Sequence, residues 1–314
     1  PLRMQHGLRE LPIDRRVINP DSRTVLLRTD ERGYILPSRR FDKPDATIVF
    51  LGGSTTECLV VDEELRFPAL VSKLLEAKGL RVDTLNAGLS GNTTHDELNL
   101  LLNHVDEDKP DVAVLMEAAN DAGVLLQDGS YRSRSGGLLN AGMALRWPLQ
   151  LASSRLWLAG ALRSYLTIGS AELPDLHDPK AEVELPAAPP EEYVKRLRAF
   201  VGLCRAFGIE PVLMTQPSVA TRTPLTPRWV TAANQALFND EMRRVAKESD
   251  VVLIDLARHL AEDVPGWEEP MKIFYDGLHV TADGSRVYAE YITQRLLETA
   301  LRGRGEKTPG GVPR

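Results

Sequence analysis

The sequence predicts an α/β fold, with a central parallel sheet covered by helices on both faces in a three-layer α/β/α sandwich. Two observations support this prediction. Short apolar runs, most of them rich in β-branched residues, recur along the chain together with longer segments of helical periodicity. The apolar runs are mostly continuous rather than alternating with polar residues, which is typical of parallel strands that are buried on both faces.

Strands and helices are expected to alternate from residue 46 onward. Five apolar runs are predicted strands, at residues 46–51, 82–85, 112–116, 210–214 and 251–254. Five segments are predicted helices, at residues 65–78, 94–105, 191–207, 232–248 and 282–301. In sheets of this kind the reactive loops gather beyond the carboxyl ends of the strands, so the residues that follow each strand are the first candidates for a site.

The chain of 314 residues suffices for one substantial domain, which we place at residues 45–301. Residues 1–44 are an expected N-terminal extension with a hairpin around Asp30–Tyr34, and residues 302–314 are an expected disordered tail. Residues 124–190 form a long connection with an apolar helical patch and a Pro-rich end. Two interpretations of this connection stay open, a helix packed on the core or a lid over an acyl or glycan pocket.

Composition and charge exclude several classes of protein. Hydrophobic residues make up 43% and charged residues 26% of the chain, ordinary globular values that argue against a disordered or fibrous protein. The net charge of -6 supplies no basic surface for a nucleic acid, and it disfavours binding to anionic lipid. Cys58 and Cys204 lie far apart beside apolar residues, so two buried thiols are expected rather than a disulfide framework.

No apolar run is long enough to predict a membrane span. The closest candidate, residues 149–168, contains Arg155 and Arg163. The chain begins at Pro1 rather than at a methionine, so a signal peptide or a membrane anchor at the natural start is an open expectation. Compartment and oligomeric state stay open.

The first candidate segment follows the first predicted strand. Gly52 and Gly53 allow a sharp turn that would lift the small hydroxyl group of Ser54 to the edge of the sheet. The backbone N–H groups after such a turn suit a developing oxyanion, so Ser54 is the candidate nucleophile. A helix cap is the plainer interpretation of this serine. The lysine of a phosphate-binding loop and the Gly-x-Ser-x-Gly elbow of ordinary α/β-hydrolases are both missing.

The second candidate segment lies just before the last predicted helix and holds Asp276 and His279. An aspartate three residues before a histidine can accept the Nδ1 proton of the ring on one helical or turn-like loop. Nε2 is then free to take a proton from a serine, and the carboxylate stabilises the imidazolium that forms. A cap, a turn former or a satisfied polar residue would explain each of the two alone. No third metal ligand accompanies them at a coherent spacing, so no metal is expected.

Two further segments contain donor groups that an oxyanion hole can use. Gly88 and Gly91 follow the second predicted strand, and Asn120 follows the third. A glycine N–H and an asparagine side-chain amide are suitable donors, although both residue types also dominate ordinary turns.

Together, the four segments in this order resemble the SGNH hydrolase family of GDSL-like esterases and lipases. The resemblance covers roughly residues 46–123 and 191–300 and implies a flavodoxin-like SGNH hydrolase fold. It implies that Ser54 attacks an ester carbonyl, that His279 moves the proton and that Asp276 orients the histidine. The implied oxyanion donors are the N–H groups of Ser54 and Gly91 and the amide of Asn120, with Gly88 as the second choice for the glycine. No cofactor is implied.

Two residues depart from the family pattern. The aspartate that often precedes the family's serine is Gly53 here, and the glycine two residues before the family's asparagine is Ala118. If position 118 needs a positive φ, alanine bears a steric cost there.

The sequence therefore predicts a serine esterase that acts on a small-molecule or glycan ester, with removal of acetyl groups from a carbohydrate as a candidate reaction. Two alternatives stay open. One is an O-acyltransferase that passes the acyl group to a sugar hydroxyl in a cleft closed by residues 124–190. The other is a catalytically inactive glycan-binding module, which Gly53 and Ala118 motivate.

Overall fold

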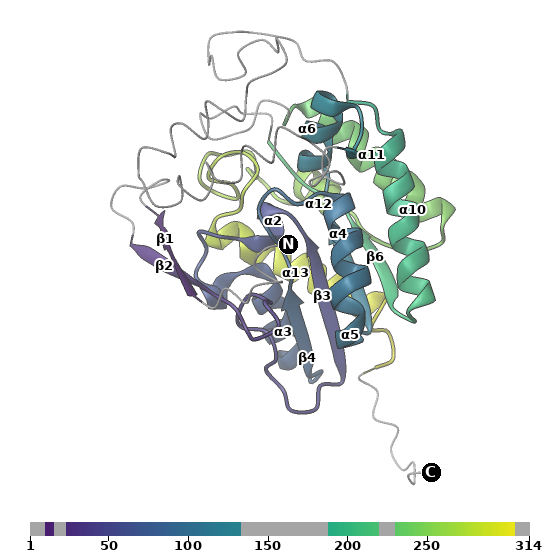
Figure 1. Cartoon of the computed structure of the whole chain (residues 1–314). Coiled ribbons are helices and arrows are strands. Elements are labelled where there is room, and N and C mark those ends of the chain that lie inside the picture. The colour runs from purple at the N-terminus through teal and green to yellow at the C-terminus, as the bar shows by residue number, and fades with distance from the viewer. Residues whose placement is uncertain (1–9, 16–22, 133–187, 220–229, 305–314) are drawn as a thin grey trace, which may run out of the picture.

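Five strands form the central sheet of the computed structural model, which describes residues 10–15, 23–132, 188–219 and 230–304 (Figure 1). The strands are β3 (Ala46–Gly52), β4 (Val82–Asn86), β5 (Val112–Met116), β6 (Glu210–Met214) and β7 (Val252–Ile254). Their order across the sheet is β4-β3-β5-β6-β7. Every neighbouring pair is parallel, so the predicted parallel sheet is confirmed.

Helices cover both faces of this sheet and complete the three layers (Figure 1). On one face lie α3 (Phe67–Ala77), α12 (Leu256–Asp263) and α13 (Ala282–Glu298). On the other face lie α4 (Thr94–Leu100), α6 (Ala119–Asp128), α10 (Glu191–Ala206) and α11 (Ala232–Glu248). Within β3, Ile48 and Phe50 join the first of these cores, while Val49 and Leu51 join the second. Burial of both faces explains why the strands read as continuous apolar runs.

The remaining elements are short. They are β1 (Glu10–Asp14), β2 (Thr24–Arg28), α2 (Ser54–Glu57), the 3-10 turn η2 (Glu63–Leu65), the π-helical turn η3 (Leu101–Val105) and α5 (Asp106–Asp108). The predicted ends of β5, β6 and α11 coincide with the observed ends, and the helix predicted at 94–105 continues through η3 into α5. Among the described residues, the four-residue helix α2 and the longer helices α6 and α12 were not predicted. The first turn of α6 is rich in small and polar residues, so its helical periodicity is faint, and α12 is short.

The strand order creates the position of the site. Because β3 lies between β4 and β5, the chain moves first to one side of β3 and then to the other. In open parallel sheets the crevice at such a reversal, beyond the carboxyl ends of the strands, is where ligands bind. Phe50 pairs with Asn86 and Gly52 with Met116, so the three strands end at nearly the same level. The loops that follow them therefore meet.

The N-terminal segment is joined to the edge of this sheet. β1 and β2 form an antiparallel pair, and the chain then reverses at Asp30–Tyr34, where a hairpin was predicted. Pairing across this turn is limited to one β-bridge. The N–H of Ile35 donates to the carbonyl oxygen of Asn86 at 2.9 Å, at the end of β4.

Arg66 forms a second, buried connection between the N-terminal segment and the rest of the fold. Its side chain is among the largest that are fully buried, at 1% exposure. Nε donates to the carbonyl oxygen of Cys58 at 3.3 Å, Nη1 to that of Leu36 at 3.3 Å and Nη2 to that of Leu26 at 3.2 Å. The loop after α2 is thereby hydrogen-bonded, through one guanidinium group, to residues that precede the sheet.

Parts of the predicted insertion and tail lie outside the described residues. Of residues 124–190, the structure describes 124–132 and 188–190, so the two interpretations of this connection stay predictions. Of the predicted tail, residues 302–304 are described, and Arg304 Nη1 donates to Asp111 Oδ1 at 2.6 Å.

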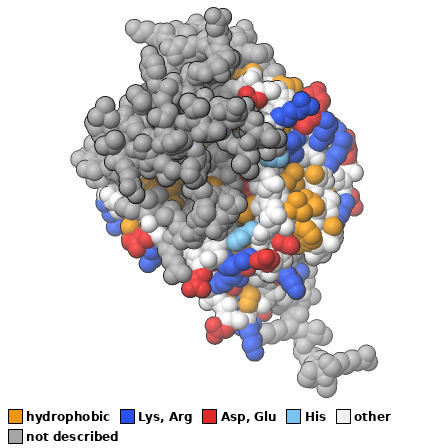
Figure 2. Space-filling model, in the orientation of Figure 1, with side chains coloured by type: hydrophobic (Ala, Val, Ile, Leu, Met, Phe, Trp, Pro, Cys, Tyr) orange, Lys and Arg blue, Asp and Glu red, His pale blue; other side chains and the backbone are white. Residues whose placement is uncertain are grey.

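The described surface carries charges of both signs. Basic and acidic side chains are interspersed on the face shown in Figure 2. Arg32, for example, donates to Glu107 at 2.8 Å and to Asp108 at 3.2 Å. No helix in the described ranges is long and apolar enough to cross a membrane. Cys58 and Cys204 are both buried free thiols, as predicted.

Candidate active site

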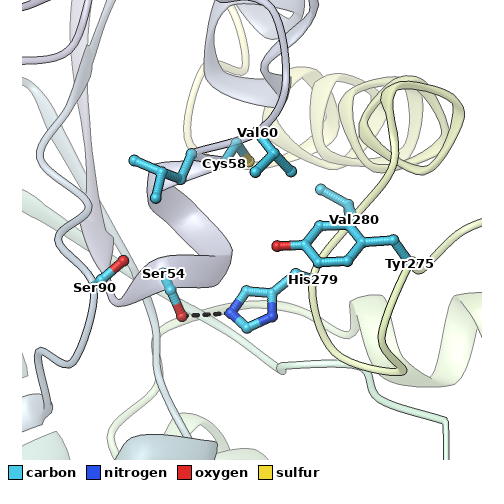
Figure 3. Close-up of a pocket in the computed structure, with 8 residues that line it drawn as sticks. Ser54, Cys58, Val60, Ser90, Tyr275, His279 and Val280 are labelled. Carbon is cyan, nitrogen blue, oxygen red and sulfur yellow. Dashed lines mark hydrogen bonds between the residues drawn. The ribbon is translucent and has the colours of Figure 1, made fainter. Parts of the chain in front are cut away.

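Ser54 is the first residue of α2, directly beyond the end of β3. The carbonyl oxygen of Gly53 accepts the N–H groups of Thr56 at 3.1 Å and of Glu57 at 3.0 Å, which closes the turn. The N–H of the first residue of a helix has no acceptor within that helix, so the Ser54 N–H can serve another acceptor. Its hydroxyl oxygen lies 2.7 Å from Nε2 of His279 (Figure 3).

His279 and Asp276 share one tight loop before α13. The loop is closed by a hydrogen bond from the Tyr275 N–H to the His279 carbonyl oxygen at 3.0 Å. Oδ2 of Asp276 lies 2.6 Å from Nδ1 of His279. Oδ1 of the same carboxylate accepts the N–H groups of Leu278 at 3.0 Å and of His279 at 2.8 Å. The structure thus brings the three predicted residues Ser54, His279 and Asp276 into one line of hydrogen bonds.

The electrostatics of this line favour an ionised aspartate. Burial alone would raise the pKa of Asp276, whose side chain is 3% exposed, but hydrogen bonds and charge from His279 outweigh it. The pKa of Asp276 is therefore held below its ordinary value. An ionised Asp276 keeps the ring proton on Nδ1 and leaves the Nε2 lone pair facing the Ser54 hydroxyl. The arrangement can move a proton from serine to histidine.

A cavity of about 310 Å³ opens beside the Ser54 hydroxyl. Its lining combines apolar side chains with hydroxyl groups, and it consists of Ser54, Cys58, Leu59, Val60, Ser90, Tyr275, His279 and Val280 (Figure 3). None of these described lining residues is a lysine, arginine, aspartate or glutamate. The cavity therefore suits an uncharged group next to the reacting atoms.

Tyr275 places a phenol in this cavity. Its ring lies nearly parallel to the His279 ring, with centroids 5.6 Å apart and an interplanar angle of 15°. The hydroxyl end of the ring points into the cavity (Figure 3). Burial raises the pKa of Tyr275 above its ordinary value, so the phenol stays protonated and can donate a hydrogen bond.

Of the two candidate glycines, Gly88 has its N–H engaged inside the protein. It donates to Oδ1 of Asn86 at 3.0 Å. A Cβ on Gly88 would lie 2.4 Å from the Glu57 nitrogen, so a glycine there allows the loop to approach α2 closely. Gly91 is exposed and has a φ of 82°, a conformation that favours glycine. These contacts favour Gly91 over Gly88 as the donor.

The loop that carries Gly91 is hydrogen-bonded to α2, the helix that begins with Ser54. The N–H of Ser90 donates to Oε2 of Glu57 at 2.8 Å, and the Ser90 hydroxyl donates to the same oxygen. Asn86 Nδ2 donates to the Thr56 carbonyl oxygen at 3.0 Å. Glu57 is buried, so these hydrogen bonds connect the loop and α2 away from bulk water.

Asn120 lies in the first turn of α6 rather than in a loop. Its Nδ2 donates to the carbonyl oxygen of Asn92 at 2.7 Å, which joins it to the Gly91 loop. A primary amide has two N–H groups, so a second one can serve another acceptor. Ala118 has a φ of -159°, which lies outside the left-handed region that favours glycine. The steric cost considered for alanine at this position therefore does not arise.

Gln216 is a site residue that the sequence did not single out. It lies two residues beyond β6 and is 2% exposed. Nε2 donates to the Thr55 hydroxyl at 2.8 Å, and Oε1 accepts the Ala119 N–H at 2.7 Å. Gln216 therefore bridges the residues that follow Ser54 and precede Asn120. Its place after a strand end was a usable signal, but the residue type alone indicated no role.

No metal centre is apparent in the part of the chain that the structure describes. No group of three or more histidine, cysteine, aspartate or glutamate side chains is arranged there to hold an ion.

The family model for the GDSL-like Lipase/Acylhydrolase family matches residues 50–287. No curated protein matches the chain in sequence. Three similar solved structures are the acetyl xylan esterase AlAXEase, the lipase/acylhydrolase from Enterococcus faecalis and a protein from Parabacteroides merdae described as a GDSL-like lipase.

These likenesses extend over nearly the whole of each neighbour. AlAXEase is 16% identical with a TM-score of 0.51, covering 79% of this chain and 98% of that chain. The Enterococcus protein is 20% identical with a TM-score of 0.50, covering 80% and 95%. The Parabacteroides protein is 15% identical with a TM-score of 0.54, covering 81% and 96%. At such identities the likeness establishes the fold alone.

Proposed function

This chain belongs to the GDSL-like Lipase/Acylhydrolase family, and on that premise we propose that it is a serine esterase working through an acyl-enzyme on Ser54. The observation that carries the proposal is the hydrogen-bonded line from Asp276 to His279 at 2.6 Å and from His279 to Ser54 at 2.7 Å. An ester bound in the adjoining cavity would have its carbonyl carbon next to the Ser54 oxygen.

In the proposed reaction, the Ser54 oxygen attacks the ester carbonyl carbon and His279 Nε2 takes the hydroxyl proton. Asp276 stabilises the imidazolium that forms. The tetrahedral intermediate then expels the alcohol, which receives the proton from Nε2, and the acyl group stays on Ser54. Water repeats the sequence, and the acid leaves.

The negative charge on the tetrahedral intermediate needs hydrogen-bond donors. We assign this role to the N–H groups of Ser54 and Gly91 and to the Asn120 amide. The hydrogen bond from Asn120 to the Asn92 carbonyl supports this assignment, because it places the amide against the loop that carries Gly91. The engaged N–H of Gly88 supports the choice of Gly91.

The cavity supports a neutral, hydroxylated alcohol as the leaving group. The alcohol must leave on the side of His279, because Nε2 protonates it, and Tyr275 stacks on that ring. A protonated phenol there can bind a hydroxyl group of the substrate, and the uncharged lining does not favour an ionic one. An acetylated sugar fits these requirements, so deacetylation of a carbohydrate is the substrate class that we propose.

The test compares the parent protein with S54A on a short-chain nitrophenyl ester and on an acetylated oligosaccharide. We expect the parent to turn over and to be labelled by a fluorophosphonate, and S54A to lose about 10⁵-fold or more in kcat without being labelled. A parent protein that shows neither turnover nor labelling would overturn the proposal.

The same experiment addresses the two alternatives from the sequence. Acyl groups appearing on an added glycan in place of free acetate would identify an acyltransferase. Unchanged glycan binding by S54A, together with an inactive parent, would identify a binding module.

A further inference from the structure

We propose that Glu117 is a positioning residue whose carboxyl group takes the place of the aspartate that often precedes the family's serine. In this chain that position is Gly53, and the carboxyl group comes from the neighbouring strand instead. The inference rests on the proposed esterase for its kinetic readout. It goes beyond that function because it assigns a role to two residues outside the hydrogen-bonded line of Asp276, His279 and Ser54.

The sheet register brings positions 53 and 117 together. Gly52 of β3 pairs with Met116 of β5 in the parallel ladder, so the next residues, Gly53 and Glu117, leave the sheet side by side. Glu117 is fully buried, at 0% exposure. A side chain at either position therefore points into the same enclosed space between the two loops.

The space beside Gly53 leaves no room for a larger side chain. A Cβ on Gly53 would lie 2.8 Å from Oε1 of Glu117, 2.5 Å from Nδ2 of Asn120 and 3.3 Å from the carbonyl oxygen of Asn92. Carbon atoms do not approach oxygen and nitrogen as closely as the first two distances, so the space is occupied. An aspartate at 53 and the present Glu117 exclude each other. A glycine at position 53 thus leaves room for both the Glu117 carboxyl group and the Asn120 amide.

The Glu117 carboxyl group and the Asn120 amide lie close to the same point. Oε1 of Glu117 and Nδ2 of Asn120 both lie within 3 Å of the same point, the Cβ position of Gly53. The Asn92 carbonyl already accepts one N–H of this amide at 2.7 Å. The backbone of Glu117 is fixed as well, because the Tyr193 hydroxyl donates to its carbonyl oxygen at 2.6 Å. In this proposal, Glu117 limits how the Asn120 amide can turn, and thereby sets the direction of its second N–H.

The experiment is a double-mutant cycle with G53D, E117A and G53D/E117A. We measure kcat and KM on a nitrophenyl ester and the melting temperature of each variant. G53D should lower kcat by about 10²-fold, as expected when an oxyanion donor is displaced. E117A should lower kcat by about tenfold with little change in KM, because the effect is on orientation rather than on binding.

The decisive result is the double variant. If the two substitutions acted independently, their reductions in kcat would multiply. We expect the kcat of the double variant to be at least about tenfold higher than that calculated value, because the new aspartate enters the space that Glu117 vacated. Purely multiplicative effects in folded variants would overturn the proposal. G53A and G53A/E117A repeat the cycle with the smallest side chain if G53D does not fold. G202D is the matched control, since a Cβ on Gly202 meets nothing within 4 Å.

The cycle also separates this inference from the esterase assignment. If the parent hydrolyses no ester, the coupling between positions 53 and 117 is still measurable in the melting temperatures. Coupled melting temperatures would then support the exchange of side chains, and additive ones would overturn it.

Discussion

The two halves of the site are constructed differently. The relay half consists of Asp276 and His279, which are three residues apart on one loop and in contact at 2.6 Å. The proposed oxyanion half draws on Ser54 after β3, Gly91 after β4 and Asn120 after β5. One half is a local arrangement, while the other depends on sheet register and on buried side chains that join separate loops.

The two halves should therefore respond differently to substitution. The relay depends on a few atoms without substitutes, so a single change should remove most of the activity. The oxyanion half is shared among several donors and supported by Glu57, Gln216 and Glu117, so single changes should cost less. Substitutions in each half can test this ranking.

The relay half should respond most strongly to D276N. An asparagine keeps the shape but favours the wrong tautomer of His279, so kcat on a nitrophenyl ester should fall by about 10⁴-fold. D263N is the matched control, because Asp263 contacts Nδ1 of His259 at 2.9 Å outside the cavity lining. A D276N variant that retained more than a tenth of the parent kcat would contradict the prediction that the relay half gives the largest effect.

The oxyanion half should respond to N120A with a loss of about 10²- to 10³-fold in kcat and a nearly constant KM. The reason is that the amide would stabilise the intermediate but not the bound substrate. N103A is the control, since that amide donates to the Asn99 carbonyl at 2.8 Å on an exposed helix surface. Equal kinetics for the two variants would leave Asn120 without a role.

The bridge between the loops should respond to Q216L with a loss of about tenfold in kcat. The variant also leaves the buried Ala119 N–H without its acceptor, at a cost of about 1–3 kcal/mol in the free energy of unfolding. Q216E keeps an acceptor for Ala119 but loses the Nε2 donor to Thr55, so its kcat should stay below that of the parent. A lowered melting temperature with parental kcat in Q216L would show that Gln216 supports stability alone.

The Y275F substitution in the cavity wall should lower kcat/KM by a factor of about 2–10, which corresponds to the loss of one neutral hydrogen bond. This loss is expected for an acetylated sugar and not for the acetate of a simple alcohol. Y291F is the control, because Tyr291 stacks on His259 at 3.9 Å, outside the cavity lining. Equal losses on both substrates would contradict binding of the alcohol by Tyr275.

The smallest effect concerns Asp121, which follows Asn120 and accepts the Thr94 N–H at 3.1 Å. Burial raises the pKa of Asp121 to about 6 in the folded protein. A raised pKa stabilises the fold fully below the ordinary value and loses this contribution as pH rises through about 6. The melting temperature of the parent relative to D121N should therefore fall between pH 4 and 7, by a few degrees. A constant difference would contradict the shift.

The same contrast explains what the sequence could predict. The strands were readable because burial on both faces makes them continuously apolar, and Asp276 with His279 were readable because their contact is local. The choice between Gly88 and Gly91 could not be made from the sequence, because it depends on the contact of Gly88 with Asn86 and α2. Gln216 gains its bridging role only from its placement between two other strand ends.

The departures from the family pattern show the same limit. Considered alone, Gly53 and Ala118 motivated the alternative of a catalytically inactive module. The register of β3 and β5 sets Gly53 beside Glu117, and the backbone at Ala118 has no positive φ. Neither fact is contained in the neighbouring sequence.

The buried guanidinium group of Arg66 affects how far the chain could be truncated at its N-terminal side. A fragment starting at residue 45 would delete Leu26 and Leu36, whose carbonyl oxygens accept hydrogen bonds from the Arg66 guanidinium group. The same group donates to the carbonyl oxygen of Cys58, on the wall of the cavity. A shortened version of the enzyme would therefore have to retain the chain from β2 onward, because a cut at the edge of the sheet would remove hydrogen-bond acceptors of a buried guanidinium group.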